Sequence, residues 1–188
     1  MTDEDTALRV TETNLDSVVL LEPPAYHDTR GFFREIFNET AFDLATGVHR
    51  DWVQDNHSRS RRNVLRGIHY QLGTPQGKLV SCISGEIFDV AVDLRRSSPS
   101  FGRWFGTSLN PTNGLQLWIP EGFGHAFLTL SEAADVLYKV TAPYDPAGNR
   151  TLAWDDPVLG IRWPLTEDPI LSDNDRRAPA LSEAEVFP

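Results

Sequence analysis

The stretch Leu65-Arg66-Gly67-Ile68-His69-Tyr70-Gln71 has the character of a half-buried β-strand. Successive side chains of a strand point to opposite faces of its sheet. Alternation therefore divides the stretch into two faces, one with Gly67, His69 and Gln71 and the other with Arg66, Ile68 and Tyr70. A histidine and a glutamine on one face indicate a hydrated interior rather than a sealed core. We expect His69 to be the base around which a functional site is built.

The run Gln54-Asp55-Asn56-His57-Ser58 shows a similar pattern a little upstream. Alternation places Gln54, Asn56 and Ser58 together on one face. Two neighbouring strands that both turn polar side chains inward favour a hollow barrel with a wet, functional lumen over a solid apolar sandwich.

Short β-rich segments separated by glycine and proline turns extend along most of the chain. Strands are expected near residues 18–22, 32–37, 52–58, 64–71, 78–84, 86–95, 102–109, 115–119, 125–130, 135–141 and 150–153. The clearest is 86–95, where one face carries Phe88, Val90, Val92 and Leu94 and the other carries Ile87, Asp89, Ala91 and Asp93. This organisation predicts an all-β sandwich or barrel. One short helix is expected over residues 40–45, because Asn38 can cap its start and Gly47 can end it.

The length of 188 residues and the hydrophobic content of 40% predict a single domain with a real core. We expect a flexible, acidic N-terminal segment over residues 1–14 and one domain over residues 15–188. The proline-rich tail over residues 155–188 should cross a surface of that domain, where Trp154 and Trp163 would pin it.

The net charge of −10 argues against a nucleic-acid partner, because no basic surface would offset phosphate repulsion. A small phosphorylated ligand remains compatible with local arginines and lysines. We expect no signal peptide, because the N-terminus is acidic and lacks an apolar stretch, and no apolar run approaches the roughly 18 residues that a membrane span needs. The single cysteine, Cys82, allows no intrachain disulfide. We therefore expect a cytoplasmic protein with no membrane or nucleic-acid partner.

Metal binding is disfavoured by the residue at position 71. A metal-binding barrel of this type would carry a His-x-His pair, a glutamate shortly after it, and a further histidine on a later strand. His69 and His125 could belong to such a set, but Gln71 stands where the second histidine is needed. We therefore expect no metal, so that His69 acts as a general base on its own.

Two further residues could complete acid–base chemistry around His69. Lys78 begins an expected strand and could stabilise an anion, and the Tyr138 phenol lies on another expected strand and could act as an acid. Each has an ordinary alternative, since a lysine at a strand start is commonly solvated and a strand tyrosine is commonly part of the core.

Longer motifs occur in order between Val18 and Pro179. They are Gln54-Asp55-Asn56-His57-Ser58, Leu65–Gln71, Gln76-Gly77-Lys78-Leu79-Val80, Gly85–Arg95, Leu117–His125, Tyr138-Lys139, Trp154-Asp155-Asp156-Pro157 and Leu171-Ser172. Together they closely resemble the dTDP-4-dehydrorhamnose 3,5-epimerase family. Because the motifs run from Val18 to Pro179, the resemblance covers nearly the whole chain. Several ungapped motifs in the same order make it specific.

The resemblance implies an isomerase of deoxysugar and rhamnose biosynthesis, with a cupin-type jelly-roll barrel and a few short helices. The family works as a homodimer without metal or cofactor. It epimerises dTDP-4-dehydro-6-deoxy-D-glucose at C3 and C5, giving dTDP-4-dehydro-L-rhamnose. The C4 ketone acidifies the protons at C3 and C5, so both centres can invert through enolates without redox chemistry. Inversion requires proton removal on one face and return on the other, and hence two different groups.

By the same resemblance, His69 is the base and Tyr138 the opposing acid. Asp175 orients the histidine, and Lys78 stabilises the enolate. Contacts to the nucleotide and the sugar fall on Arg30, Glu35, Gln54, Asn56, Arg66 and His125, with Tyr144 stacked on thymine.

The sequence departs from the family at Asn149, where a glutamate is expected, and at Asn174, where a lysine is expected. Both positions belong to the substrate-binding set, so affinity or sugar preference could differ. Alternatives that remain are a C3-only or C5-only epimerase of an antibiotic deoxysugar pathway, a 3,4-ketoisomerase, and a non-catalytic sugar-binding module.

Arg30 and Glu35 pose a geometric problem, because strict alternation places them on opposite faces of one strand. Both could contact one ligand if Gly31 allows a bulge. Contribution across a dimer interface is the other solution.

Overall fold

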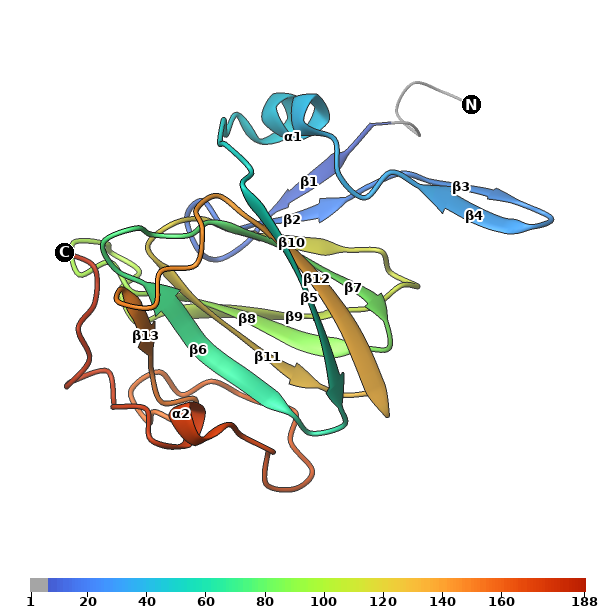
Figure 1. Ribbon diagram of the computed structural model, residues 1–188. Coiled ribbons are helices and arrows are strands. Elements are labelled where there is room, and N and C mark those ends of the chain that lie inside the picture. The colour runs from blue at the N-terminus through green and yellow to red at the C-terminus, as the bar shows by residue number, and fades with distance from the viewer. Residues whose placement is uncertain (1–6) are drawn as a thin grey trace.

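Two antiparallel β-sheets facing one another form the body of the protein in the computed structural model, which describes residues 7–188 (Figure 1). The first sheet has the order β1-β2-β10-β7-β12-β5, with β1 (Arg9–Glu12), β2 (Val19–Glu22), β10 (Gln116–Ile119), β7 (Lys78–Ser84), β12 (Ala133–Val140) and β5 (Gln54–Arg61). The second has the order β13-β6-β11-β8-β9, with β13 (Asn149–Thr151), β6 (Leu65–Gln71), β11 (Phe123–Thr129), β8 (Ile87–Asp93) and β9 (Trp104–Leu109). The predicted all-β architecture is confirmed.

The core between the sheets forms because alternate residues of each strand turn inward. Val80, Leu117 and Val136 come from the first sheet and are fully buried. Ile87 and Phe127 meet them from the second sheet. This apolar packing holds the two sheets together and leaves the polar residues of β5 and β6 to line a separate space.

Strand β8 divides its side chains as its sequence predicts. Ile87 and Ala91 belong to the core between the sheets. Val90 and Val92 face the other way, where the C-terminal segment over residues 152–187 packs against them. The second sheet is therefore buried on both faces, which explains why β8 is rich in apolar residues on both sides.

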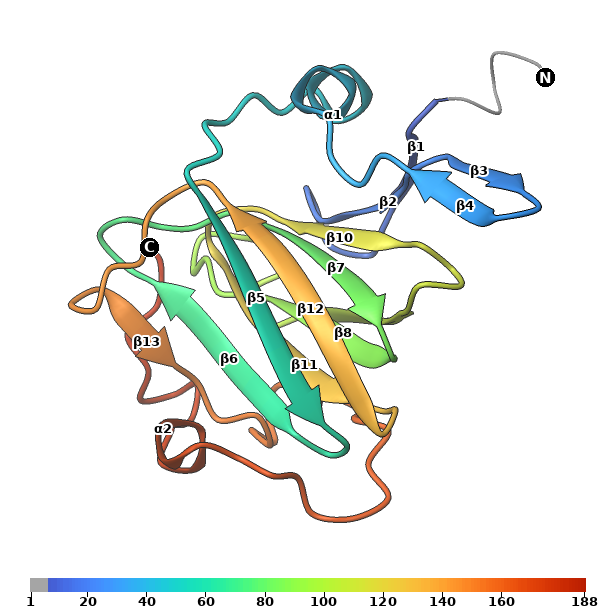
Figure 2. The same cartoon turned by 45° about the vertical axis from the view of Figure 1, so that its right-hand side comes forward.

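The C-terminal segment crosses the outer face of the second sheet (Figure 1). Trp163 packs edge-on against Phe88 of β8, with ring centroids 6.0 Å apart, which confirms the predicted pinning for this tryptophan. Its indole N–H donates a 2.8 Å hydrogen bond to the backbone carbonyl of Trp154. A short helix that the sequence analysis did not predict, α2 (Asp173–Arg176), lies within this segment beside β6 (Figure 2). The tail thereby brings residues from the end of the chain next to the strand that carries His69.

The predicted short helix is confirmed as α1 (Glu39–Thr46). The Asn38 side chain accepts a 3.1 Å backbone hydrogen bond in the first turn, and Gly47 ends the helix with a φ of 68°. Its buried residue Phe42 packs edge-on against Trp52, with ring centroids 5.2 Å apart. Within residues 7–188, neither helix has the length and apolar character needed to cross a membrane.

The N-terminal region is more ordered than expected. Residues 9–12 form β1, which pairs with β2, so the prediction of a flexible segment over residues 1–14 is wrong for this part. Residues 1–6 lie outside the described residues. A second element without a matching expectation is β3 (Ala25–Asp28), which pairs with β4 (Gly31–Arg34). Figures 1 and 2 show this hairpin projecting from the body of the molecule.

Strict alternation along β6 fails at Gly67. This residue has a φ of +116°, and a Cβ there would lie 2.5 Å from a carbonyl oxygen of β11, so only glycine fits. Ile68 and Tyr70 pack outward against the tail as predicted. Arg66, however, turns toward β5 and donates a 3.0 Å hydrogen bond to the Ser60 hydroxyl. The prediction that Arg66 shares a face with Ile68 and Tyr70 is wrong.

Candidate functional site

His69 and Asp175 form a hydrogen-bonded pair between β6 and α2. The Nε2 atom of His69 lies 2.5 Å from Oδ1 of Asp175. When Nε2–H donates to the carboxylate, the other ring nitrogen, Nδ1, carries the lone pair of the neutral imidazole. The pair is therefore an oriented base with one free basic nitrogen.

Asp175 is fixed from several sides. Asp175 is only 3% exposed, and its Oδ2 accepts a 2.7 Å hydrogen bond from the Ser172 hydroxyl. Burial alone would raise the pKa of Asp175, but hydrogen bonds from His69, Ser172 and the Gly67 backbone hold the pKa below its ordinary value. An ionised, immobile carboxylate thus holds one ring nitrogen of His69 in place.

Lys78 is a buried cation next to His69. Its ammonium group donates a 3.4 Å hydrogen bond to the His69 carbonyl oxygen. Burial lowers the pKa of Lys78 to about 8, an effect that the negative charge of Asp89 partly opposes. Lys78 is therefore mostly charged at neutral pH, in surroundings where a positive charge acts strongly on an anion.

Tyr138 lies on β12, directly opposite Asn56 of β5. Its side chain is half-buried at the edge of the apolar core. Burial raises the pKa of Tyr138, and the positive charge of Arg66 opposes that effect in part. The phenol keeps its proton at neutral pH and can donate it to a ligand.

The side chains of His69, Lys78 and Tyr138 meet at one cavity of about 160 Å³. Its lining consists of Gln54, Asn56, His69, Tyr70, Gln71, Gln76, Lys78, Tyr138, Tyr144 and Asn149. The cavity therefore joins the predicted base, acid and cation with four of the predicted ligand contacts. The polar interior predicted from the alternation of β5 and β6 is present in the structure.

Tyr144 lies at the cavity with a largely exposed side chain, 58% accessible to solvent. Its backbone N–H donates a 3.3 Å hydrogen bond to the Gln54 side chain. Gln54 in turn donates a 2.7 Å hydrogen bond to the Asn56 side chain. An exposed aromatic ring beside two amides is an arrangement that can stack on a flat base and bind polar groups below it.

His125 is held behind the cavity rather than in it. It lies opposite His69 on β11, and its Nε2 is 2.8 Å from Oδ1 of the fully buried Asp89. Asp89 has no predicted role, yet it forms this pair and its negative charge acts on Lys78. The available signal was a carboxylate on the core-facing side of a strand, between Ile87 and Ala91.

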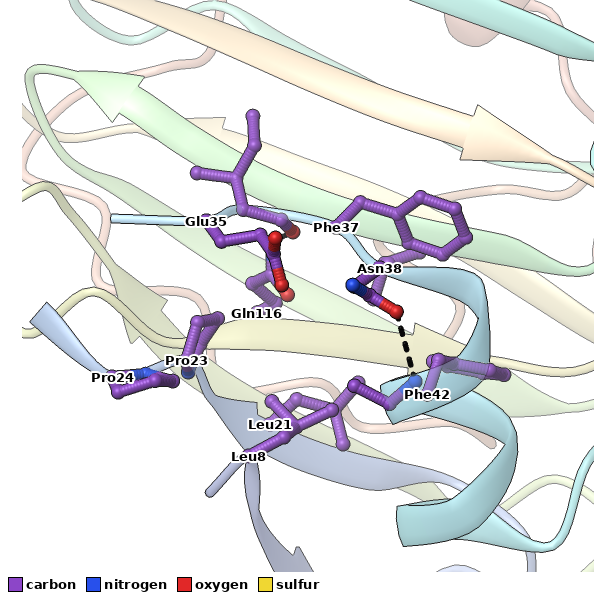
Figure 3. A pocket seen from close by; sticks show the side chains of 12 residues that line it. Leu8, Leu21, Pro23, Pro24, Glu35, Phe37, Asn38, Phe42 and Gln116 are labelled. Atoms are coloured by element: carbon purple, nitrogen blue, oxygen red, sulfur yellow. Dashed lines mark hydrogen bonds between the residues drawn. The ribbon is translucent and has the colours of Figure 1, made fainter. Parts of the chain in front are cut away.

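Besides His125, four predicted ligand contacts are absent from the lining of this cavity in the single chain: Arg30, Glu35, Arg66 and Asn174. Arg30 lies at the turn of the β3–β4 hairpin, where its side chain is 88% exposed and pairs with Asp28. Glu35 lines a separate cavity of about 60 Å³ (Figure 3). Asn174 is exposed on α2.

Two of the remaining histidines pair with single carboxylates. His49 Nδ1 lies 2.6 Å from Asp43, and His57 Nε2 lies 3.0 Å from Asp135. Across the described part of the chain, no three His, Cys, Asp or Glu side chains converge as a group that could hold a metal ion.

A family model described as dTDP-4-dehydrorhamnose 3,5-epimerase matches residues 12–183. The chain belongs to the dTDP-4-dehydrorhamnose 3,5-epimerase family. A dTDP-4-dehydrorhamnose 3,5-epimerase from Pseudomonas aeruginosa is 50% identical over 181 residues, which cover 96% of this chain and 100% of the relative.

Solved structures support the same assignment to the 3,5-epimerase family. The dTDP-6-deoxy-D-glucose-3,5-epimerase of Legionella pneumophila, in complex with dTDP-4-keto-L-rhamnose, is 45% identical and has a TM-score of 0.93, with 95% of each chain covered. A 3′-monoepimerase from Streptomyces bikiniensis, in complex with dTDP-quinovose, is 36% identical with a TM-score of 0.85, covering 90% of this chain and 86% of that one. The predicted family and its cupin-type jelly-roll fold are confirmed.

Proposed function

We propose that the chain epimerises dTDP-4-dehydro-6-deoxy-D-glucose at C3 and C5 to give dTDP-4-dehydro-L-rhamnose. The observation that carries the proposal is the single cavity shared by His69, Tyr138 and Lys78, with Asp175 bonded to His69. The names of the relatives support a 3,5-epimerisation of a dTDP-ketosugar, and the Legionella structure contains dTDP-4-keto-L-rhamnose.

In this reaction His69 removes a proton from a carbon next to the C4 ketone. The proton goes to Nδ1, and the C–H electron pair moves into the enolate. Asp175 stabilises the imidazolium that forms. Tyr138 then donates its proton to the opposite face of the carbon, and the phenolate and the imidazolium return to their starting states by exchange with water. Each centre inverts because removal and return use different groups.

Lys78 supplies the charge that the enolate needs. A buried anion without a counter-charge would cost several kcal/mol. The ammonium group is held close to His69 by the carbonyl bond, so it can face the developing oxyanion while His69 faces the proton. The three groups have complementary roles around one ketosugar.

The nucleotide would extend from the sugar toward Tyr144. Stacking of the Tyr144 ring on thymine agrees with the exposed position of Tyr144 at the cavity. Gln54, Asn56 and Asn149 supply hydrogen-bonding groups on the way. Arg66 is not part of the cavity lining, but its positive charge acts on Tyr138 and could also attract the diphosphate. The acidic chain thereby acquires a local anion site.

We further propose a cytoplasmic homodimer in which the β3–β4 hairpin of one subunit completes the cavity of the other. The hairpin projects from the body and exposes Tyr26, Phe32 and Phe33, the last of them 68% accessible (Figure 2). Arg30 at its turn cannot serve the cavity of its own chain as placed, so contribution across a two-fold interface is favoured over a bulge.

Product analysis by NMR tests the proposed reaction. Incubation of the protein with dTDP-4-dehydro-6-deoxy-D-glucose should yield the L-rhamno ketosugar with its carbonyl still at C4. A carbonyl at C3 would instead indicate a 3,4-ketoisomerase. A protein that binds the ketosugar and leaves it unchanged would be a binding module.

A further inference from the structure

Gln71 uses its whole side-chain amide to hold backbone groups near the cavity. Its Nε2 donates to the Thr74 carbonyl at 2.8 Å and to the Pro143 carbonyl at 3.2 Å. Its Oε1 accepts the Asp145 backbone N–H at 2.9 Å. Two of these three partners are the residues immediately before and after Tyr144, so one side chain fixes the main chain on both sides of that aromatic ring.

Two other glutamines hold adjoining parts of the same segment. Gln54 accepts the Tyr144 backbone N–H at 3.3 Å, and Gln76 donates to the Ala142 carbonyl at 2.7 Å. The backbone of four successive residues, 142–145, is therefore bonded to side-chain amides of Gln54, Gln71 and Gln76. We call residues 142–145 the Tyr144 segment.

We propose that Gln71 is a positioning residue for nucleotide binding, which acts by fixing the Tyr144 segment before the ligand arrives. This inference rests on the proposed function, in which Tyr144 stacks on thymine. Because the Tyr144 side chain is 58% exposed, side-chain packing does little to fix its position. A prearranged backbone removes part of the ordering cost that a mobile segment would add to ligand binding.

The chemistry of an amide explains why glutamine suits position 71. An amide offers two N–H donors and one carbonyl acceptor, and all three functions are used here. Gln71 is only 3% exposed, so its role is exercised through the Tyr144 segment rather than by direct bonds to the ligand. A neutral histidine has one donor and one acceptor and could not hold the same three groups.

Gln71→Met tests the inference, because it keeps the length of the side chain and removes all three bonds. We expect KM for the ketosugar and the calorimetric Kd for dTDP to rise about tenfold, with kcat within about twofold of wild type. The rise should depend on Tyr144. In a Tyr144→Ala background, Gln71→Met should change Kd by less than about twofold, since the ring it positions is gone.

Asn113 provides a matched control. It is another partly buried amide that holds three backbone groups, those of Ser108, Asn110 and Leu115. It lies in the turn between β9 and β10, outside the cavity lining. Asn113→Leu should lower the melting temperature without changing Kd for dTDP. Equal effects of the two substitutions on Kd would overturn the specific role of Gln71.

A second variant and a measurement on the wild type cover the case in which Gln71→Met does not fold. Gln71→Glu keeps the acceptor for Asp145 and removes both donors, so it should weaken dTDP binding in the same direction. In the unliganded wild type, amide hydrogen exchange in the Tyr144 segment should already be slow and change little on adding dTDP. Fast exchange that becomes slow only with dTDP would overturn the inference.

The outcomes separate this inference from the proposed function. A wild type that epimerises the ketosugar, with a folded Gln71→Met variant that binds dTDP normally, overturns the inference alone. A wild type that neither converts the ketosugar nor binds dTDP overturns both. If Gln71→Met weakens dTDP binding in the wild-type background but has no effect on Kd in the Tyr144→Ala background, both the inference and the proposed function are supported.

Discussion

Asp175 reaches His69 across 106 positions of the chain, and the two side chains meet at 2.5 Å. The contact exists because the C-terminal segment folds back over the second sheet and places α2 beside β6. Asp175 is also held by Ser172, so the carboxylate is fixed before it orients the imidazole. The tail of the chain is thus part of the candidate active site.

Asp175→Asn should reduce kcat by about 10²–10⁴-fold, because an amide can neither hold the His69 ring in the same state nor stabilise the imidazolium. KM should change little, since Asp175 lies behind His69 and does not line the cavity. Steady-state kinetics on the ketosugar measure both values. Asp173→Asn is the matched control, as Asp173 is exposed on the same helix turn. An equal loss in both variants would contradict the specific role of Asp175.

His69→Asn and Tyr138→Phe should fail in different ways. Without His69 no proton is removed, so exchange and epimerisation should both fall by about 10²–10⁴-fold. Without the Tyr138 hydroxyl, His69 can still remove a proton and return one to the same face. Tyr138→Phe should therefore incorporate solvent deuterium into substrate of unchanged configuration, as detected by NMR. Loss of exchange in Tyr138→Phe alone, with His69→Asn still exchanging at the wild-type rate, would reverse the two assignments.

Activity should decline as the pH rises through about 8. Lys78 has its pKa lowered to about 8 by burial, so its positive charge is lost in that range and the enolate loses its counter-charge. Lys78→Met should lower kcat by about 10²–10³-fold and remove this alkaline decline from the remaining activity. A pH profile of kcat for both proteins checks the prediction. An alkaline decline unchanged in Lys78→Met would assign it to another group.

Lys78 should also lower the free energy of unfolding at neutral pH. Its ordinary pKa of 10.5 falls to about 8 on folding. Between these values the unfolded chain binds more protons than the folded one, so the free energy of unfolding rises with pH in this window. Lys78→Met should be more stable than wild type by about 1–3 kcal/mol at pH 7, at about 1.4 kcal/mol per pKa unit. Urea unfolding at pH 7 and pH 10 should show the difference shrinking, and a difference that grows would contradict it.

Mixed dimers test whether the β3–β4 hairpin acts on the partner subunit. Co-expression of Arg30→Ala and His69→Asn chains gives mixed dimers in which one cavity has both native residues if the hairpin crosses. We expect recovery of about a quarter of wild-type activity with random pairing in a two-fold dimer. A His69→Asn and Tyr138→Phe mixture is the control, since both residues line one cavity and neither site is restored. No recovery in the first mixture would place Arg30 outside the site or within its own chain.

The elements that could be predicted are those that a short stretch of sequence specifies by itself, through a helix cap or an alternation of side chains. Helix α1 follows from its cap at Asn38 and its stop at Gly47, and β8 from its alternating faces. Strand β1 was missed because all four of its residues are exposed and it is stabilised by pairing with β2 rather than by an apolar face. The orientation of Arg66 was missed because the conformation of Gly67 interrupts the alternation.

The site was predictable only in part from its own residues. Alternation indicated that His69 and Asn56 face a polar interior, and both line the cavity. Asp175 came from the family resemblance, because no local pattern connects a four-residue helix with a strand so far away in sequence. The role of Gln71 depends on backbone groups of a distant segment, which side-chain patterns do not encode.

Exchange of substrate protons with solvent tests the central claim most directly. The wild-type protein is incubated in D₂O with dTDP-4-dehydro-6-deoxy-D-glucose, and deuterium is located by NMR. If His69 and Tyr138 invert both centres, deuterium appears at C3 and at C5 of the product. Deuterium at neither carbon would contradict the account, and deuterium at one carbon alone would make the protein a mono-epimerase.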